Sequence, residues 1–247
     1  RALVASAAAP VVVVASVDLP TVVPAGAAAM GRHPFGRPWH GVAANHPMVP
    51  PGLAAEQLAT ARAVARATQD TWAATEVRRA IAASESSALA DEIVPFGDLP
   101  ADELVPARVG DADALAELPP RFDPEGSLTA GNSAPPADGA VAVVVADPGW
   151  AAQHGCAPLA ELLSVRLAAG AADDPIGAAV VAAREAMADA TVQHADLATV
   201  EVDEPTAVGA LALVDDLALE RELVNPNGGP LAFGDLAAGG GLRALTA

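Results

Sequence analysis

The residues of this chain that could do chemistry are its single cysteine, its five histidines and several acidic side chains in its last fifth. Cys156 is the only thiol, so it is the sole candidate for thiol nucleophilic chemistry, and neither an internal disulfide nor a cysteine metal cluster can form. Asp203 and Glu204 are adjacent acids after an apolar run, which is typical either of a solvated turn or of an acid–base pair. Asp235 precedes a run of Ala and Gly, where it could act as a helix N-cap.

The remaining motifs argue against metal and nucleotide chemistry. His33, His40 and His46 lie seven and six residues apart in a loop rich in Gly and Pro, which fits neither a helical i, i+4 pair nor zinc-finger spacing. We therefore expect no metal site. The glycine run at 239–241 follows no strand, a Walker motif is excluded because the chain has no Lys, and no G-x-S-x-G hydrolase motif occurs.

The charge of the chain restricts its partners. Thirteen basic residues face 31 acidic ones, which leaves a net charge of −18 and argues against nucleic acid and anionic lipid as ligands. A polyanion such as coenzyme A would need a local basic rim, and six arginines in the first third are the candidates: Arg32, Arg37, Arg62, Arg66, Arg78 and Arg79.

The bulk composition indicates a globular protein in a reducing compartment. Slightly over half of the residues are apolar, mostly Ala and Val, which favours packed α/β layers. The apolar stretches are far shorter than the roughly 20 residues of a membrane-spanning helix, so we expect no membrane segment. A single cysteine is simplest to explain in the cytoplasm. The chain starts at Arg1 without Met, which we interpret as the inside of a longer protein, with a signal-peptide remnant as the alternative.

Apolar patterning predicts alternating strands and helices. The β-branched run at 11–17 reads as a buried strand of a parallel sheet, and a loop rich in Gly and Pro follows it. Residues 53–83 lack Gly and Pro, and we predict two helices there, broken near Thr68. Further strands are predicted at 91–96, 140–145, 159–167 and 197–202, and helices at 177–190 and 206–219. Such alternation indicates an α/β protein with parallel sheet layers.

One stretch of about twenty residues has a specific resemblance. It reads Phe122-Asp123-Pro124-Glu125-Gly126-Ser127-Leu128-Thr129-Ala130-Gly131-Asn132-Ser133-Ala134, followed by Asp138-Gly139-Ala140 and a valine run. This is very similar to the thiolase segment F-x-x-x-G-[ST]-x-T-A-G-N-x-S with its D-G-A and strand. The match keeps register over many positions, and a Gly-Asn turn leading into Asp-Gly is not a generic loop.

Three other stretches resemble the same family in the same order. The helical pair and the segment Asp91-Glu92-Ile93-Val94-Pro95 are similar to its loop domain. The segment 200–207 is similar to its E-x-N-E-A-F-A loop. The segments 224–229 and 231–235 are similar to its V-N-x-N-G-G-x-x-x-x-G-H-P motif.

The resemblance implies a thiolase-like layered αβαβα fold with an incomplete first half. Residues 1–30 would be the tail of the N-terminal half, residues 31–118 a largely helical loop domain, and residues 119–247 most of the C-terminal half. A protein of this kind would be expected to form a homo- or hetero-oligomer with a thiolase-like subunit. Its family ligand would be coenzyme A or an acyl-CoA, with no cofactor held tightly.

The resemblance also implies which positions would carry the family's chemistry. In the family one cysteine takes up the acyl group, a histidine activates it, an asparagine holds an oxyanion-hole water and a second cysteine moves a proton. Here Asp235 occupies the histidine position and Asp203 the asparagine position, while both cysteine positions fall outside the chain. The coenzyme A serine falls on Ala134, with Ser133 one place early. Cys156 matches an ordinary turn before a strand, so we expect it to be inert and structural.

The sequence therefore leaves three interpretations of function. The first is a thiolase-like protein of acyl-CoA metabolism that has lost catalysis and acts as a subunit or acyl-CoA-binding module. The second is a fragment of an acyl-CoA C-acyltransferase whose nucleophile lies on segments outside this chain. The third is a new enzyme that uses Asp203, Glu204 and Asp235 as its acids and bases.

Overall fold

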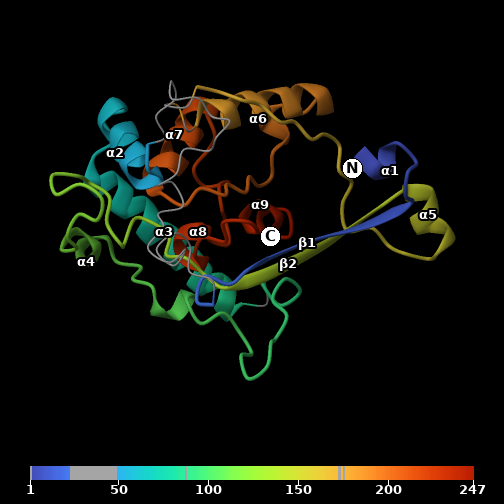
Figure 1. Ribbon diagram of the computed structural model, residues 1–247, viewed down its shortest axis with the longest axis horizontal. Coiled ribbons are helices and arrows are strands. Elements are labelled where there is room, and N and C mark those ends of the chain that lie inside the picture. Colours follow the sequence, from blue (N-terminus) through green and yellow to red (C-terminus); the bar gives the residue numbers. More distant parts are fainter. Residues whose placement is uncertain (1, 23–48, 87, 172–173, 175) are drawn as a thin grey trace.

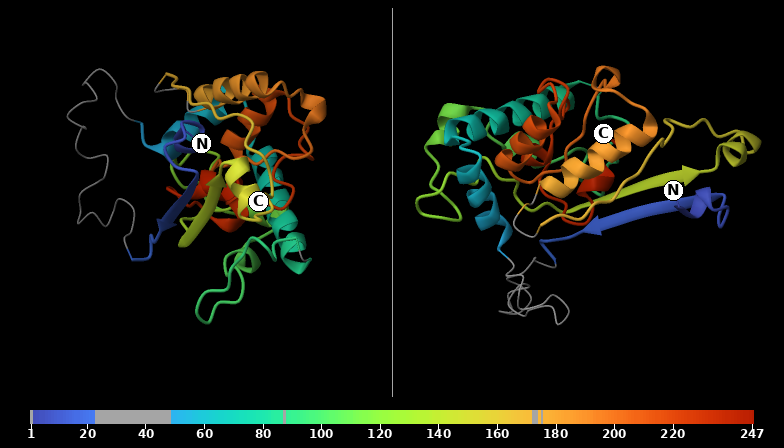
Figure 2. Two further views of the ribbon diagram at one scale, coloured as in Figure 1. Left: turned by 90° about the vertical axis from the view of Figure 1, so that its right-hand side faces the viewer. Right: turned by 90° about the horizontal axis from the view of Figure 1, so that it is seen from above.

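The computed structural model of the chain describes residues 2–22, 49–86, 88–171, 174 and 176–247. His33, His40 and His46, with Arg32 and Arg37, lie outside the described residues. Figure 1 shows a helical body from which a two-stranded sheet extends, and Figure 2 shows the same arrangement from two further directions. Two short helices, α1 (Ala2–Ala5) and α5 (Pro148–Gln153), lie at the outer end of this sheet.

The sheet consists of β1 (Val11–Asp18) and β2 (Gly139–Ala146), which pair antiparallel with Val11 opposite Ala146 and Asp18 opposite Gly139. The predictions of strands at 11–17 and 140–145 are thus confirmed, but the prediction of a buried parallel sheet is wrong for the described residues. The paired residues lie 121 to 135 positions apart in the sequence and run antiparallel, a direction that the alternation of strands and helices does not indicate.

One face of this sheet is apolar and open. Side chains alternate between the two faces of a sheet, and three cross-strand pairs place six exposed side chains on this face. The most exposed of its large residues are Val13 (66 %) and Val144 (64 %). We call this surface the valine face, and its members are Val13, Ala15, Val17, Ala140, Ala142 and Val144.

The body is organised around α3 (Arg66–Glu85), which packs against α4 (Ala112–Ala116), α7 (Ala207–Leu217), α8 (Pro230–Phe233) and the 3-10 turn η1 (Val105–Ala107). The helix α2 (Pro51–Ala61) precedes α3, and the break lies at 62–65, slightly before the predicted position near Thr68, because Ala63 adopts a left-handed conformation with φ of 51°. The two predicted helices are otherwise confirmed.

The helix α7 is almost wholly buried, and Thr206 caps it by accepting a hydrogen bond from the Gly209 amide at 3.2 Å. The helix α6 (Gly177–Ala190) has the predicted bounds and lies against α7. Both predicted helices of this region are therefore confirmed. The remaining elements are the 3-10 turn η2 (His194–Asp196) and the short helix α9 (Gly240–Ala244).

Three predicted strands do not form. Residues 159–167 have no regular structure, and Leu159 and Leu167 are almost fully exposed. The segment 91–96 makes only an isolated bridge at Phe96, and the segment 197–202 only one at Val200 with Val224. An apolar run becomes a strand only when a neighbouring segment supplies backbone partners along its length. In the described chain, residues 159–167 pair with no segment, and each of the other two segments forms a bridge at a single residue.

A buried polar network ties the segment 123–132 to the helices. Asn132 is fully buried, and its amide donates to Asp70 at 2.9 Å and to the Ser127 carbonyl at 3.0 Å. Glu56 accepts hydrogen bonds from the backbone amides of Ser127 and Leu128. These contacts hold the segment in place on α2 and α3, and it leads directly to the residues with predicted roles.

Candidate functional site

The residues with predicted roles lie on three chain segments that run side by side. Ser133 forms an antiparallel bridge with Thr206, and the Ala134 amide donates to the Pro205 carbonyl at 2.7 Å. Pro136 forms a parallel bridge with Asp235, whose amide donates to Pro135 at 2.7 Å. The segment at 133–137 therefore lies between the segments that carry Asp203 and Asp235, and it positions both relative to one another.

Carboxylates dominate this site. Burial raises the pKa of Asp203, and the negative charge of Asp235 raises it further, so these two groups are close enough to interact. Burial likewise raises the pKa of Asp235, with Asp18 at the end of β1 adding to the effect. Burial raises the pKa of Glu204 to about 7, although Thr206 donates to this carboxylate at 2.8 Å. The groups of this site that can take up or release a proton are therefore carboxylates, and none of the three is an imidazole base.

One cation faces this acidic site. Arg243 of α9 pairs with Glu92 at 3.1 Å and lies over the Phe233 ring at 4.0 Å. Its positive charge lowers the pKa of Glu201 and of Asp203, yet burial still raises the pKa of Glu201 to about 7. Glu92 and Glu201 lie in segments that resemble the family but were given no role from the sequence, and Arg243 was not singled out. No spacing signal could have found them, because they come together only through the folded backbone.

The cleft between these groups is very small. Its volume is about 10 Å³, enough for roughly one water molecule, and it is lined by Glu201, Val202, Asp203, Gly229, Pro230, Gly234, Leu236, Gly240, Arg243 and Ala244. A side chain at Gly240 would collide with the Asp203 carboxylate, since an added Cβ would lie 2.3 Å from its oxygen. The arrangement brings carboxylates against the start of α9 and leaves little space for an organic substrate.

The two positions predicted for coenzyme A differ in environment. Ser133 is 3 % exposed, and its hydroxyl is buried without a hydrogen-bond partner among the described residues. Ala134 is half-buried. The four described arginines of the predicted basic rim are engaged elsewhere: Arg62 with Asp216, Arg66 with Asp70, Arg78 with the Gly110 carbonyl and Arg79 with the Val224 carbonyl. These four arginines are therefore not free to form the predicted basic rim, and coenzyme A binding stays a prediction.

Cys156 lies away from this site. It follows α5, which Figure 1 shows at the outer end of the sheet, whereas α8 and α9 lie at the body. The thiol is exposed and donates only a long contact of 3.9 Å to the His154 carbonyl. The expectation of a turn at this position is confirmed, but the strand expected to follow it is absent, and the thiol is not buried.

The helix-cap interpretation of Asp235 is wrong. The helix α9 begins five residues later, with Gly239 at its N-cap, and Asp235 instead takes part in the bridge with Pro136. Asp203 keeps an exposed surface at the cleft, as a solvated turn would, and is only partly desolvated by its neighbours, whereas Glu204 is half-buried and bonded to Thr206.

Among the described residues, no group of three His, Cys, Asp or Glu side chains is arranged to hold a metal ion. Over the same part of the chain, the helices are too short or too polar to cross a bilayer.

Comparison with known proteins identifies similar families and folds. The family model for the thiolase N-terminal domain matches residues 37–148, and that for the thiolase C-terminal domain matches residues 156–247. An acetyl-CoA acetyltransferase of Rhizobium meliloti (strain 1021) is 36 % identical over 202 residues, which covers 78 % of this chain and 51 % of the relative. A 3-ketoacyl-CoA thiolase of Escherichia coli O1:K1 / APEC is 34 % identical over 208 residues, covering 79 % and 54 %. The chain thus spans about half the length of the curated relatives it matches.

A solved structure shares the fold. The dimeric peroxisomal thiolase of Saccharomyces cerevisiae aligns over 99 % of this chain and 63 % of its own, with a TM-score of 0.87 and 22 % identity. At that identity the comparison shows the fold alone. It confirms the expected α/β class and the expected thiolase-like architecture.

Proposed function

Since the chain belongs to the thiolase family, we propose that it serves acyl-CoA metabolism as a thiolase-like subunit that performs no carbon–carbon bond chemistry at its own site. The observation that carries this proposal is that aspartates, Asp203 and Asp235, stand at the positions matching the family's asparagine and histidine, on segments that the residues 133–137 bring together. The division into portions at 1–30, 31–118 and 119–247 stays a prediction.

The chemistry of the two carboxylates opposes catalysis. An asparagine amide can donate to a water or a developing oxyanion, whereas an ionised Asp203 offers only acceptors and repels negative charge. A histidine can accept a thiol proton near neutral pH, whereas an aspartate at Asp235 is a weaker base and would repel the thiolate. Each replacement alone removes a step that acyl transfer through a thioester requires.

The small cleft and its charge also support a subunit over an acyl-CoA-binding module. Coenzyme A carries several phosphate charges, and the net charge of −18 with the carboxylates at the cleft raises the cost of bringing it there. The buried Ser133 hydroxyl is the one feature that favours a contact with a pantetheine chain. We accordingly expect coenzyme A to bind with a Kd of about 1 mM or weaker, measurable by titration calorimetry.

The valine face supports association with a second chain. Six apolar side chains in one continuous exposed sheet face form the kind of surface that soluble proteins cover with a partner. A solved structure of the same fold is described as dimeric. We propose that this face contacts a second copy or a related thiolase-like subunit.

Light scattering after size exclusion tests the association. The chain, of 24.4 kDa, should run at twice that mass or more at concentrations of about 10–50 µM, alone or after mixing with a purified acetyl-CoA acetyltransferase. A strictly monomeric species in both samples would contradict the proposal. A dimer that survives when Val13 and Val144 are replaced by Lys would place the interface elsewhere.

A further inference from the structure

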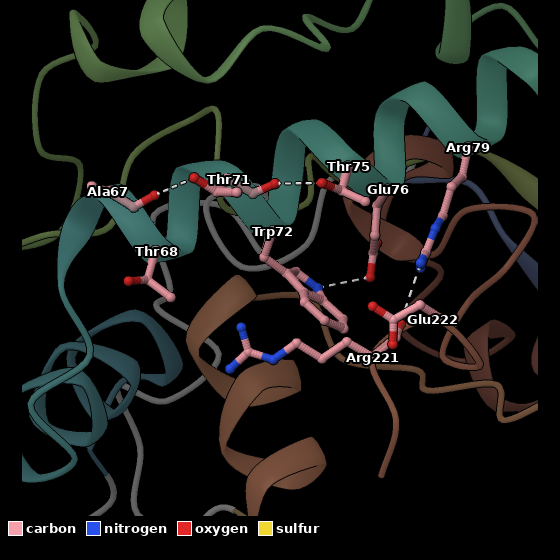
Figure 3. A pocket seen from close by; sticks show the side chains of 9 residues that line it. All are labelled: Ala67, Thr68, Thr71, Trp72, Thr75, Glu76, Arg79, Arg221 and Glu222. Carbon is pink, nitrogen blue, oxygen red and sulfur yellow. Dashed lines mark hydrogen bonds between the residues drawn. The ribbon is translucent and has the colours of Figure 1, made fainter.

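A cavity of about 410 Å³ lies beside α3, where the turn at 220–224 comes up against the helix (Figure 3). It is about forty times larger than the cleft at Asp203 and falls within the size range of small-molecule sites. It shares no lining residue with that cleft. Its lining consists of Ala67, Thr68, Thr71, Trp72, Thr75, Glu76, Arg79, Arg221 and Glu222.

The inner wall of this cavity is fixed by hydrogen bonds. The Trp72 indole donates to the buried Glu76 carboxylate at 3.0 Å, and the Asn225 amide donates to the same oxygen at 2.9 Å. Arg79 donates to the Val224 carbonyl at 2.6 Å and thereby holds the turn against α3. A ligand would therefore meet a wall that needs no reordering.

The upper wall is a row of threonines on α3. The hydroxyls of Thr71 and Thr75 donate to the carbonyls of Ala67 and Thr71 at 2.7 and 2.8 Å. The Thr71 oxygen keeps its lone pairs as acceptors, whereas the Thr75 oxygen already accepts from Arg78 at 2.9 Å. Their methyl groups, with Ala67 and the Trp72 ring, give the middle of the cavity an apolar character. This combination suits a short hydrocarbon stem.

Two opposite charges stand at different ends of the cavity. Figure 3 shows the Arg221 guanidinium on the side of Thr68 and Trp72, and Glu222 on the side of Arg79. Within the described chain, Arg221 makes only a long, exposed ion pair of 3.4 Å with Asp215. The Glu222 side chain makes no ion pair or hydrogen bond with any residue of the described ranges. Both charges are therefore available to a ligand.

We propose that this cavity binds a small zwitterion, with the ligand's carboxylate on Arg221, its ammonium on Glu222 and its hydrocarbon stem against Trp72 and the threonine methyl groups. A simple anion would meet Glu222 as well as Arg221, and a simple cation would meet Arg221 as well as Glu222. A molecule that carries both charges satisfies both ends at once. The site is independent of the function proposed above, because none of its residues takes part in the carboxylate cleft.

A series of amino acids with increasing stem length tests the proposal. The probes are glycine, 4-aminobutyrate and 6-aminohexanoate, compared with butyrate and butylamine, which carry one charge each. Binding is followed through the indole N–H resonance of Trp72, assigned with the Trp72→Phe variant. Both charged side chains are exposed, so we expect a Kd in the millimolar range for the best-fitting zwitterion and about tenfold weaker binding of the single-charge compounds.

Variants then locate the binding. Arg221→Gln and Glu222→Gln should each weaken binding about fivefold, and Thr71→Phe should abolish it by filling the cavity without changing a charge. Glu220→Gln, an exposed neighbour outside the lining, is the matched control and should leave binding unchanged.

Three outcomes would overturn the proposal. The first is equal binding of zwitterions and single-charge compounds. The second is a Trp72 shift that persists in Thr71→Phe while circular dichroism shows that variant to be folded. The third is no shift with any zwitterion up to about 50 mM.

Discussion

Replacing Glu204 by Gln should stabilise the protein at alkaline pH. Burial and the neighbouring charges of Asp203 and Asp235 raise the pKa of Glu204 from its ordinary value of 4.5 to about 7. Each unit of pKa difference between the folded and unfolded states corresponds to about 1.36 kcal/mol, so this pKa difference corresponds to about 3.4 kcal/mol in the free energy of unfolding. Because the side chain is only half-buried, solvent screening reduces the expected effect to about 2 kcal/mol.

The sign follows from proton binding. The folded protein holds the Glu204 proton to a higher pH than the unfolded chain does, so the folded state binds more protons between about pH 4.5 and 7. The stabilisation that protonated Glu204 gives to the folded state is complete below about pH 4.5 and is lost as the pH rises through about 7. Gln keeps an oxygen that can accept the hydrogen bond from Thr206 and never ionises, so it does not suffer this loss.

Urea unfolding followed by circular dichroism at pH 4.5 and pH 8 measures the effect. Glu204→Gln should match the parent protein at pH 4.5 and exceed its free energy of unfolding by about 2 kcal/mol at pH 8. Glu117→Gln removes an exposed carboxylate outside the site and should change neither value by more than about 0.5 kcal/mol. Equal or lower stability of Glu204→Gln at pH 8 would refute the account of this site's electrostatics.

Three further predictions concern association and stability. The paired substitution Val13→Lys and Val144→Lys should convert an oligomer to a monomer without unfolding it, because both residues lie exposed on the valine face. Light scattering measures the mass, and an unchanged mass would contradict this prediction. Asn132→Ala should lower the free energy of unfolding by about 2–3 kcal/mol in urea titration, because it leaves the buried Asp70 and Ser127 acceptors without their donor. Arg62→Gln should cost less than about 1 kcal/mol in the same assay, because its ion pair is exposed to solvent; a larger loss would show a buried role.

The sequence predicted the helices well because their signals are local. Residues 177–190 and 206–219 carry helical spacing, and the structure has helices in both places. The helical pair before residue 86 was also predicted, with an error of a few residues where Ala63 turns left-handed. A backbone reversal of this kind has no residue signature when Ala rather than Gly adopts it.

The strands could not be predicted from apolar runs alone. Residues 159–167 contain four leucines and a valine, yet they remain irregular, because no other segment of the described chain pairs with them. Strand formation depends on a partner that is distant in sequence, and pattern alone does not name that partner. The burial of β1 was also predicted wrongly, since a β-branched run fits an exposed valine face as well as a buried one.

The site was predicted in part. The family positions Ala134, Asp203 and Asp235, with Ser133 next to the first, lie on neighbouring segments of the structure. Their roles stay predictions. Arg243, which faces the same carboxylates from α9, could not be anticipated because it belongs to no motif and reaches the site through the fold of the C-terminal segment.

Incubation of the purified chain with acetyl-coenzyme A, and separately with a 3-ketoacyl-coenzyme A plus free coenzyme A, tests the central claim most directly. Loss of one oxyanion donor alone typically costs about 10²- to 10³-fold in rate, and Asp235 cannot activate a thiol in place of histidine. We therefore predict no thioester loss above a heat-treated control and no acylated protein by mass spectrometry. Turnover well above that control, abolished by Asp203→Ala or Asp235→Ala, would contradict the account and show that these carboxylates do chemistry.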